Sequence, residues 1–226
     1  MLSHLTDNLE LWRIGFFNTF SLTILSFAIG FFIAIPVGMA RVHEGTWLSR
    51  IAYGYVYLIR GTPLLVQIFM IYYGLGQFHQ ELREVGLWWI FRDPYYCGLL
   101  ALTLNTVAYQ AEIVRGAIIA IPKNLEEGGA SIGLTTFQIY RFIKIPISIA
   151  RMLPALGNEL VLLLKASALV SVITVADVMG QARYLFSETL DLNVYYIAAI
   201  NYLVIVVVIE AILRRLEARN VWLSPR

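Results

Sequence analysis

The sequence lacks most of the groups that soluble enzymes use. Cys97 is the single cysteine among 226 residues, which excludes an internal disulfide and a cysteine-rich metal site. Neither a G-x-x-x-x-G-K-[ST] phosphate-binding loop nor a G-x-S-x-G nucleophile elbow occurs. The three histidines, His4, His43 and His79, lie outside the long apolar runs. No imidazole is therefore placed to ligate haem or to relay protons within those runs.

Charge is also scarce. Charged residues make up 14% of the chain and the formal net charge is only +2, so composition gives no basic surface for nucleic acid. What the chain has instead is apolar: 59% of its residues are hydrophobic, and the mean hydropathy is +0.70. A soluble domain of average composition is much more polar. We therefore predict an all-α membrane protein.

Five apolar runs each exceed the roughly 20 residues that a helix needs to cross a bilayer. They cover residues 14–40, 51–76, 96–119, 147–175 and 192–213. We predict one transmembrane domain of five helices over residues 1–226, with the first run retained because it is too long for a signal-peptide core. The fourth run is the least regular, since Pro154, Gly157, Glu159 and Lys165 interrupt it.

The charges in the connections predict an orientation. Arginine and lysine dominate the first connection, the third connection and the C-terminal segment, whereas acidic residues offset the arginines of the second and fourth connections. By the positive-inside rule, the first group is cytoplasmic. The N-terminus is then outside and the C-terminus inside.

The third connection, residues 124–146, reads NLEEGGASIGLTTFQIYRFIKIP. Asn124 is a good N-cap, and Glu127 stands three positions later, where its side chain can return to the cap. Thr135 and Gln138 repeat the spacing. The pattern predicts two short helices on the cytoplasmic side.

Gly133 and Pro146 mark the limits of the second of these helices. Gly133 lies between the two helices, where a left-handed C-cap conformation costs least in glycine. Pro146 either ends the second helix or opens the next element at its first turn. From these residues alone, the segment is either a simple connector or a functional elbow, and we call residues 124–146 the elbow.

The elbow resembles the EAA loop of ABC importer permeases. The matching positions are Glu127, Gly128, Gly129, Gly133, Ile143 and Pro146, with glycines in place of the two alanines and Ile145 in place of the usual leucine. Three further stretches are similar to polar amino-acid permeases: RGTPLLVQIFMIYYG at 60–74, LNTVAYQAEIVRGAI at 104–118 and GNELVLLLKASALVSVITV at 157–175. The resemblance is greatest to the subgroup that serves histidine, arginine and opines.

The resemblance implies a transport subunit of the bacterial inner membrane that is not itself an enzyme. The elbow would dock on a cytoplasmic ATPase, with Glu126, Glu127, Gly128, Gly129, Gly133 and Pro146 as coupling residues. Two ATPase subunits would bind ATP and Mg²⁺, and this chain would bind no cofactor. A second permease, similar or identical, and an external amino-acid-binding protein complete the expected assembly.

Polar residues within the predicted spans are the candidates for solute contact, because ionisable groups are costly there and usually functional. Glu159 lies about 18 Å along a span that begins at Ile147, near the midplane. We predict that it contacts the positive group of a basic amino acid; the alternative is a buried interhelical ion pair. Asn158, Asn105, Tyr109 and Lys165 are further candidates, although a buried Asn also serves as an interhelical hydrogen-bonding group.

Arg60, Glu112 and Arg115 fall in the cytoplasmic half of the predicted spans, and we interpret them as an ion pair for helix packing or gating. Two other functions remain open. One is a gradient-driven secondary transporter, which would usually show internal repeats, although five spans do not divide into two equal halves. The other is a channel subunit, which would need an oligomer to supply a ring of pore-lining residues. The sequence specifies neither the solute nor whether the permease pair is homomeric.

Overall fold

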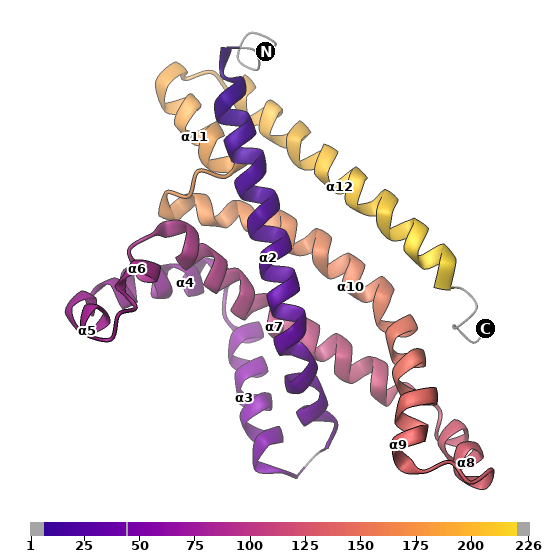
Figure 1. The fold of residues 1–226 in the computed structure, drawn as a ribbon. Helices are drawn as coiled ribbons and strands as arrows, with labels where there is room; N and C mark the ends of the chain where they lie inside the picture. Colours follow the sequence, from indigo (N-terminus) through magenta and orange to yellow (C-terminus); the bar gives the residue numbers. More distant parts are fainter. Residues whose placement is uncertain (1–6, 44, 221–226) are drawn as a thin grey trace.

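The computed structural model describes residues 7–43 and 45–220, and every regular element in them is helical, which confirms the all-α prediction (Figure 1). The α-helices are α2 (Leu9–Val42), α3 (Trp47–Gly61), α4 (Leu64–Phe69), α5 (His79–Glu84), α6 (Trp88–Phe91), α7 (Pro94–Ile119), α8 (Lys123–Ser131), α9 (Thr136–Ile139), α10 (Ile145–Ser167), α11 (Val178–Thr189) and α12 (Asn193–Asn220). Two π-helical turns, η1 (Met70–Gly74) and η2 (Tyr140–Lys144), and the 3₁₀-helix η3 (Ala168–Ile173) continue some of these helices.

Four helices are long and apolar enough to cross a membrane: Leu9–Val42, Pro94–Ile119, Thr136–Ile173 and Asn193–Leu216. A bent pair, Trp47–Gly61 with Leu64–Gly74, brings the number to five if it counts as one span. The first, third and fifth spans agree with the sequence-based ranges to within a few residues. The second and fourth spans differ from the predicted ranges in how the helix is built.

The second span is broken, so the prediction of one continuous helix over residues 51–76 was wrong. α3 and α4 meet at Thr62 and Pro63 with a bend of 104°. Thr62 is extended, with φ −118° and ψ 145°. The residue before a proline disfavours the helical conformation, and proline lacks the N–H that a helix interior needs, which explains the break.

The fourth span begins inside the elbow, earlier than residue 147. Helix runs without interruption from Thr136 to Ile173. Pro146 falls in the first turn of α10, directly after the π-helical turn η2, and Pro154 lies within α10. A wider π turn supplies room where a proline cannot complete the usual hydrogen bond. Pro146 therefore opens α10 at its first turn, which confirms one of its two predicted roles, and neither proline ends the helix.

Small residues let α2 approach α7 closely, and this is the most extensive helix contact in the fold. A Cβ atom added to Gly30 would lie 2.6 Å from Thr106 Cγ2, and one added to Gly38 would lie 2.7 Å from the carbonyl oxygen of Ala111. Glycine at these positions is the usual means of bringing membrane helices together. α7 in turn packs against α10, so α2, α7 and α10 form the centre of the bundle.

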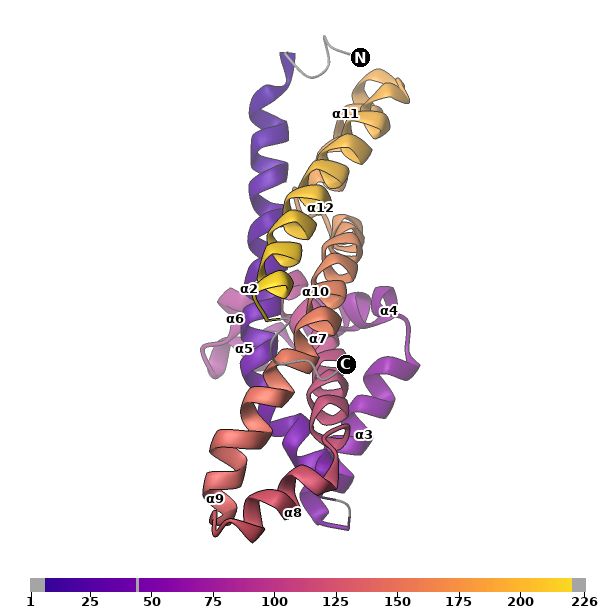
Figure 2. The same ribbon diagram turned by 90° about the vertical axis from the view of Figure 1, so that its right-hand side faces the viewer.

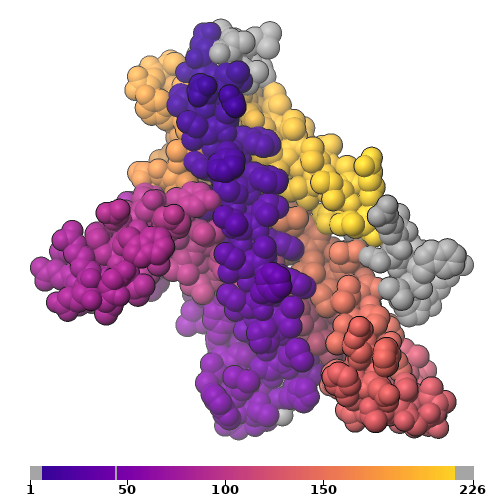
Figure 3. Space-filling view, viewed as in Figure 1, coloured from indigo at the N-terminus to yellow at the C-terminus, as the bar shows by residue number. Residues whose placement is uncertain are grey.

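The elbow and α11 lie at opposite ends of the molecule. α8 and α9 project from the end away from the N-terminus, while α11 lies beside the first turns of α2 (Figures 1 and 2). In the space-filling view the elbow and the segment from α5 to α6 protrude as separate lobes (Figure 3). The elbow is thus outside the packed bundle, whereas the predicted solute residues are within or on it.

Candidate translocation site and coupling elbow

Glu159 is a buried acid in the middle of α10. It is 8% exposed, and its Oε1 accepts a hydrogen bond of 3.0 Å from Thr106 Oγ1 of α7. Thr106 is fully buried and lies against Gly30 of α2. Among the side chains that the structure describes, residues 7–43 and 45–216, no ion pair joins Glu159 to a cation, so these residues do not form the interhelical ion pair that was its alternative interpretation.

Asn105, one residue before Thr106, faces the broken span instead. Its Nδ2 donates to Gln67 Oε1 at 3.1 Å, and Gln67 Nε2 donates to the carbonyl oxygens of Ile59 at 2.8 Å and Thr62 at 3.2 Å. The break leaves these carbonyl oxygens without a hydrogen-bond donor from the helix backbone, and the Gln67 side chain provides that donor. Gln67 was not predicted from the sequence, although a glutamine four residues after a proline in an apolar run was the available signal.

Asn158 and Lys165 do not converge with Glu159. Both are exposed and, seven residues apart, they lie on one face of α10 together with Leu162, which is 50% exposed. Asn158 also lines a cavity of about 210 Å³ beside Glu210 and Arg214 of α12.

Glu112 binds three arginines, one more than the sequence predicted. Arg115 Nε lies 3.3 Å from Glu112 Oε1, and Arg60 Nη1 lies 3.7 Å from Oε2. The additional partner is Arg41 at the end of α2, whose Nη1 also pairs with Oε1. Arg60 stacks 5.1 Å above the ring of Tyr109, so Tyr109 belongs to this cluster and not to the Glu159 site.

The second helix of the elbow begins as the sequence predicts. Thr135 Oγ1 accepts from the backbone N–H of Gln138, and Gln138 Oε1 accepts from the backbone N–H of Thr135, which completes a capping box. Gly133 has a φ of +85°, a left-handed conformation that favours glycine. The turn between the two elbow helices is therefore specified by its sequence.

The first elbow helix begins differently. α8 starts at Lys123, with Pro122 in the cap position, and no side chain caps it. Asn124 therefore lies inside the first turn, and the predicted Asn124–Glu127 capping pair was wrong. Glu126 forms an ion pair of 2.7 Å with Lys144, and Glu127 is exposed. The proline, whose φ is already suitable for a helix start, sets the boundary.

Gly128 and Gly129 have different surroundings. A Cβ at Gly129 would lie 2.9 Å from Ile143 Cδ1, whereas one at Gly128 would meet nothing within 4 Å. The lack of a side chain at Gly129 therefore lets α8 pack closely against the second elbow helix. The elbow also exposes apolar side chains, with Ile132 and Phe137 each 77% exposed.

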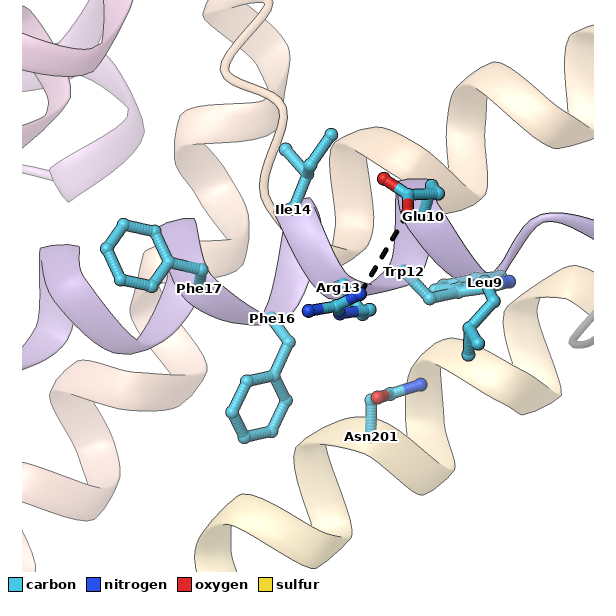
Figure 4. A pocket seen from close by; sticks show the side chains of 8 residues that line it. All are labelled: Leu9, Glu10, Trp12, Arg13, Ile14, Phe16, Phe17 and Asn201. Carbon is cyan, nitrogen blue, oxygen red and sulfur yellow. Dashed lines mark ion pairs between the residues drawn. The ribbon is translucent and has the colours of Figure 1, made fainter.

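The largest described cavity is remote from all of these groups. It measures about 670 Å³ and lies near the N-terminal end of α2, where Asn201 of α12 also lines it (Figure 4). Its walls are mostly apolar, and its charged pair, Glu10 and Arg13, is highly exposed. None of the predicted solute or coupling residues lines it.

Comparison with known proteins identifies the family. The model of the family described as binding-protein-dependent transport system inner membrane component matches residues 15–221. The chain belongs to this family. It is thus a multi-pass permease of the inner membrane, and the family implies an external binding protein and an ATPase as partners.

Individual relatives of the permease are similar over most of its length. The nopaline transport system permease protein NocM of Agrobacterium fabrum is 43% identical over 209 residues, which cover 92% of this chain and 86% of the relative. The arginine ABC transporter permease protein ArtM of Haemophilus influenzae is 39% identical over 199 residues, 88% of this chain and 87% of the relative. The crystal structure of an amino acid ABC transporter with histidines aligns with a TM-score of 0.84 and 34% identity, covering 95% of this chain and 96% of that chain.

Proposed function

We propose that this permease imports polar amino acids, with preference for basic amino acids or opine-like solutes, and that Glu159 contacts the positive group of the solute. The observation that carries the proposal is the burial of this acid between α7 and α10, where Thr106 is its hydrogen-bond donor. A carboxylate in the interior of a membrane protein is costly unless a cation neutralises it. The relatives named for nopaline and arginine support the solute class.

The permease acts as one half of a pair, with a second similar permease or a second copy of itself. The exposed polar stripe of α10, which includes Asn158 and Lys165, supports this arrangement, because it would otherwise face lipid. Two ATPase subunits bind and hydrolyse ATP with Mg²⁺, and the elbow carries their motion into α10. The continuous helix from Thr136 to Ile173 supports this coupling, since it joins the elbow rigidly to Glu159.

The N-terminus lies outside and the elbow lies in the cytoplasm, as the charge distribution predicts. Single cysteines at Ser131 and Gln80, in a background where Cys97 is replaced, test the orientation. Both positions are exposed. The Gln80 cysteine should react with a membrane-impermeant thiol reagent in intact cells, and the Ser131 cysteine only after permeabilisation. Labelling of both from one face contradicts the proposed topology.

The function itself is tested with the complete complex, purified by a tag on this chain and reconstituted in liposomes. Uptake of L-arginine should require ATP and the binding protein. A complex that hydrolyses no ATP, and whose uptake follows an imposed proton or sodium gradient, would contradict an ABC importer and indicate a secondary transporter. Uptake down the solute gradient alone would indicate a channel.

Coupling is tested at one glycine of the elbow and one outside it. Gly133→Ala places a side chain at a φ of +85°, whereas Gly54→Ala adds a methyl group to α3 in open space. The first costs about 1 kcal/mol and distorts the turn, and the second favours the helix. Gly133→Ala should lower uptake per ATP hydrolysed, with no change in Gly54→Ala. Equal coupling in both variants would make the elbow a simple connector.

A further inference from the structure

Three guanidinium groups share one carboxylate in the cytoplasmic half of the bundle. Arg41 of α2, Arg60 of α3 and Arg115 of α7 all pair with Glu112. We call these four residues the arginine cluster; its formal charge is +2. Only 10% of the Arg41 side chain and 22% of the Glu112 side chain are exposed. The Arg60 side chain is 44% exposed, so the excess positive charge of the cluster includes an arginine that a ligand from outside the chain can reach.

The bonds within the cluster leave Arg60 the least engaged. Arg115 donates to both carboxylate oxygens of Glu112, and Arg41 pairs with Oε1. Arg60 Nη1 lies 3.7 Å from Oε2, beyond hydrogen-bond length. The guanidinium carbon of Arg60 instead lies 5.1 Å from the centre of the Tyr109 ring, a cation–π contact. Arg60 therefore keeps N–H donors that Glu112 does not saturate.

A cavity adjoins these donors. It measures about 370 Å³ and is lined by Arg41, Arg60 and Glu112 of the cluster and by Tyr53, Tyr57 and Tyr109. The arginine fork matches the geometry of a carboxylate, to which it donates two parallel hydrogen bonds. A bound carboxylate would also halve the net charge of the cluster. Size, charge and donor geometry therefore favour the same ligand group.

We propose that the arginine cluster binds the α-carboxylate of the solute, as a second station on the cytoplasmic side of Glu159. This inference rests on the proposed function, because it takes the solute to be an amino acid. Thr106, which holds Glu159, and Glu112 are six residues apart in α7, about 9 Å of helical rise. The positive and negative groups of the solute are thus bound at separate places along one helix.

The test measures direct binding to the complete complex without nucleotide, in nanodiscs of phosphatidylcholine. The probes are L-arginine and agmatine, which differ only in the carboxylate, and a second pair, L-glutamine and gamma-aminobutyramide, covers a neutral solute. Arg60→Gln should weaken binding of the amino acids about tenfold, or about 1.4 kcal/mol, and leave the decarboxylated probes unchanged. Arg60→Lys should restore part of the loss, because it keeps the charge and not the fork.

Arg50→Gln is the matched control. Arg50 is exposed on the same helix and lines a neighbouring cavity with Arg41 and Arg115, but it makes no ion pair with Glu112. It should bind all four probes as the wild type does. An equal loss for amino acids and decarboxylated probes in Arg60→Gln would overturn the proposal and make Arg60 a structural residue.

Three other outcomes also overturn the proposal. The first is equal binding of each amino acid and its decarboxylated analogue by the wild type, and the second is the absence of all binding. The third is a tenfold loss of binding in Arg60→Gln that appears only in nanodiscs with anionic lipid, which would assign the cluster to lipid phosphate. ATP-driven uptake separates these failures from that of the proposed function. If ATP-driven uptake persists, the importer function stands and only the carboxylate site is rejected. If the wild type shows no uptake, both the importer function and the carboxylate site are rejected.

Discussion

Glu112 of α7 and Glu159 of α10 lie on two helices that pack against each other, and the protein surrounds these two glutamates differently. Glu112 pairs with three arginines from three helices, and Arg60 next to it is 44% exposed. Glu159 is more deeply buried and receives its hydrogen bond from a neutral threonine. A carboxylate with built-in cations is neutralised by the protein, whereas one without them is available to a cation that arrives from outside. The first arrangement holds helices together, and the second suits a transient ligand.

The largest expected effect separates the two acids by stability. Glu112→Gln leaves three arginines without their anion, which we expect to cost about 2–3 kcal/mol, below the value for a fully buried pair because Arg60 is partly exposed. Glu159→Gln removes a buried charge and should be neutral or stabilising. Thermal unfolding of the two variants in detergent measures this. Glu210→Gln, which affects only the exposed pair with Arg214, is the control. Equal destabilisation by Glu112→Gln and Glu159→Gln would contradict the different roles assigned to the two glutamates.

A smaller effect concerns the setting of Glu159. Thr106→Val keeps the shape of the side chain and removes the hydrogen bond to Glu159. We expect solute affinity to fall about tenfold, since a hydrogen bond to a charged group contributes roughly 1.5–3 kcal/mol. Thr103→Val is the matched control, because Thr103 lies one turn earlier in α7 and donates only to the carbonyl of Leu99 in its own helix. The same loss in both variants would indicate a general effect on α7.

The smallest expected effect is a pH dependence at a third buried acid, outside the spans. Asp177, before α11, accepts hydrogen bonds from Gly180 N at 2.8 Å and Tyr202 Oη at 3.1 Å. Burial raises the pKa of Asp177 to about 6, against the opposing effect of these hydrogen bonds. Because the folded value exceeds the unfolded value of about 3.9, the folded state binds the proton more tightly.

The contribution of Asp177 to stability is therefore fully present below pH 4, is lost as the pH rises towards 6, and stays lost above it. Unfolding stability should decrease by roughly 1 kcal/mol between pH 5 and pH 7 relative to Asp177→Asn, which still caps α11. Thermal unfolding of both proteins at the two pH values measures the difference. Parallel pH profiles would show that Asp177 does not titrate in this range.

Apolar run length and cap chemistry made much of this fold predictable. The spans at 14–40, 96–119 and 192–213 and the Thr135–Gln138 box are local features that need no tertiary contact. The break at Thr62 and Pro63 was missed because hydropathy does not register backbone geometry. Pro146 opens α10 as one of its two predicted roles required, but the sequence did not show that a π turn would join the elbow helix to α10 without a break.

The site was predictable only in part. Glu159 stands out by charge in an apolar run, and the structure leaves its solute role as a prediction. Its neighbour Asn158 was placed with it, but consecutive residues on a helix point about 100° apart, and Asn158 faces outward. Arg41 was counted as a loop charge, because nothing in the sequence shows that the end of α2 returns to α7 beside Glu112.

The central claim is that Glu159 takes the positive group of the solute, and substrate binding by Glu159→Gln tests it most directly. The complete complex, with ATPase activity confirmed for both proteins, is titrated with L-arginine and with L-glutamine. We expect Glu159→Gln to lose affinity for L-arginine by at least about tenfold, equivalent to 1.4 kcal/mol, and to lose less for neutral L-glutamine. Unchanged affinity for both amino acids would contradict the assignment of Glu159 and leave only the family membership.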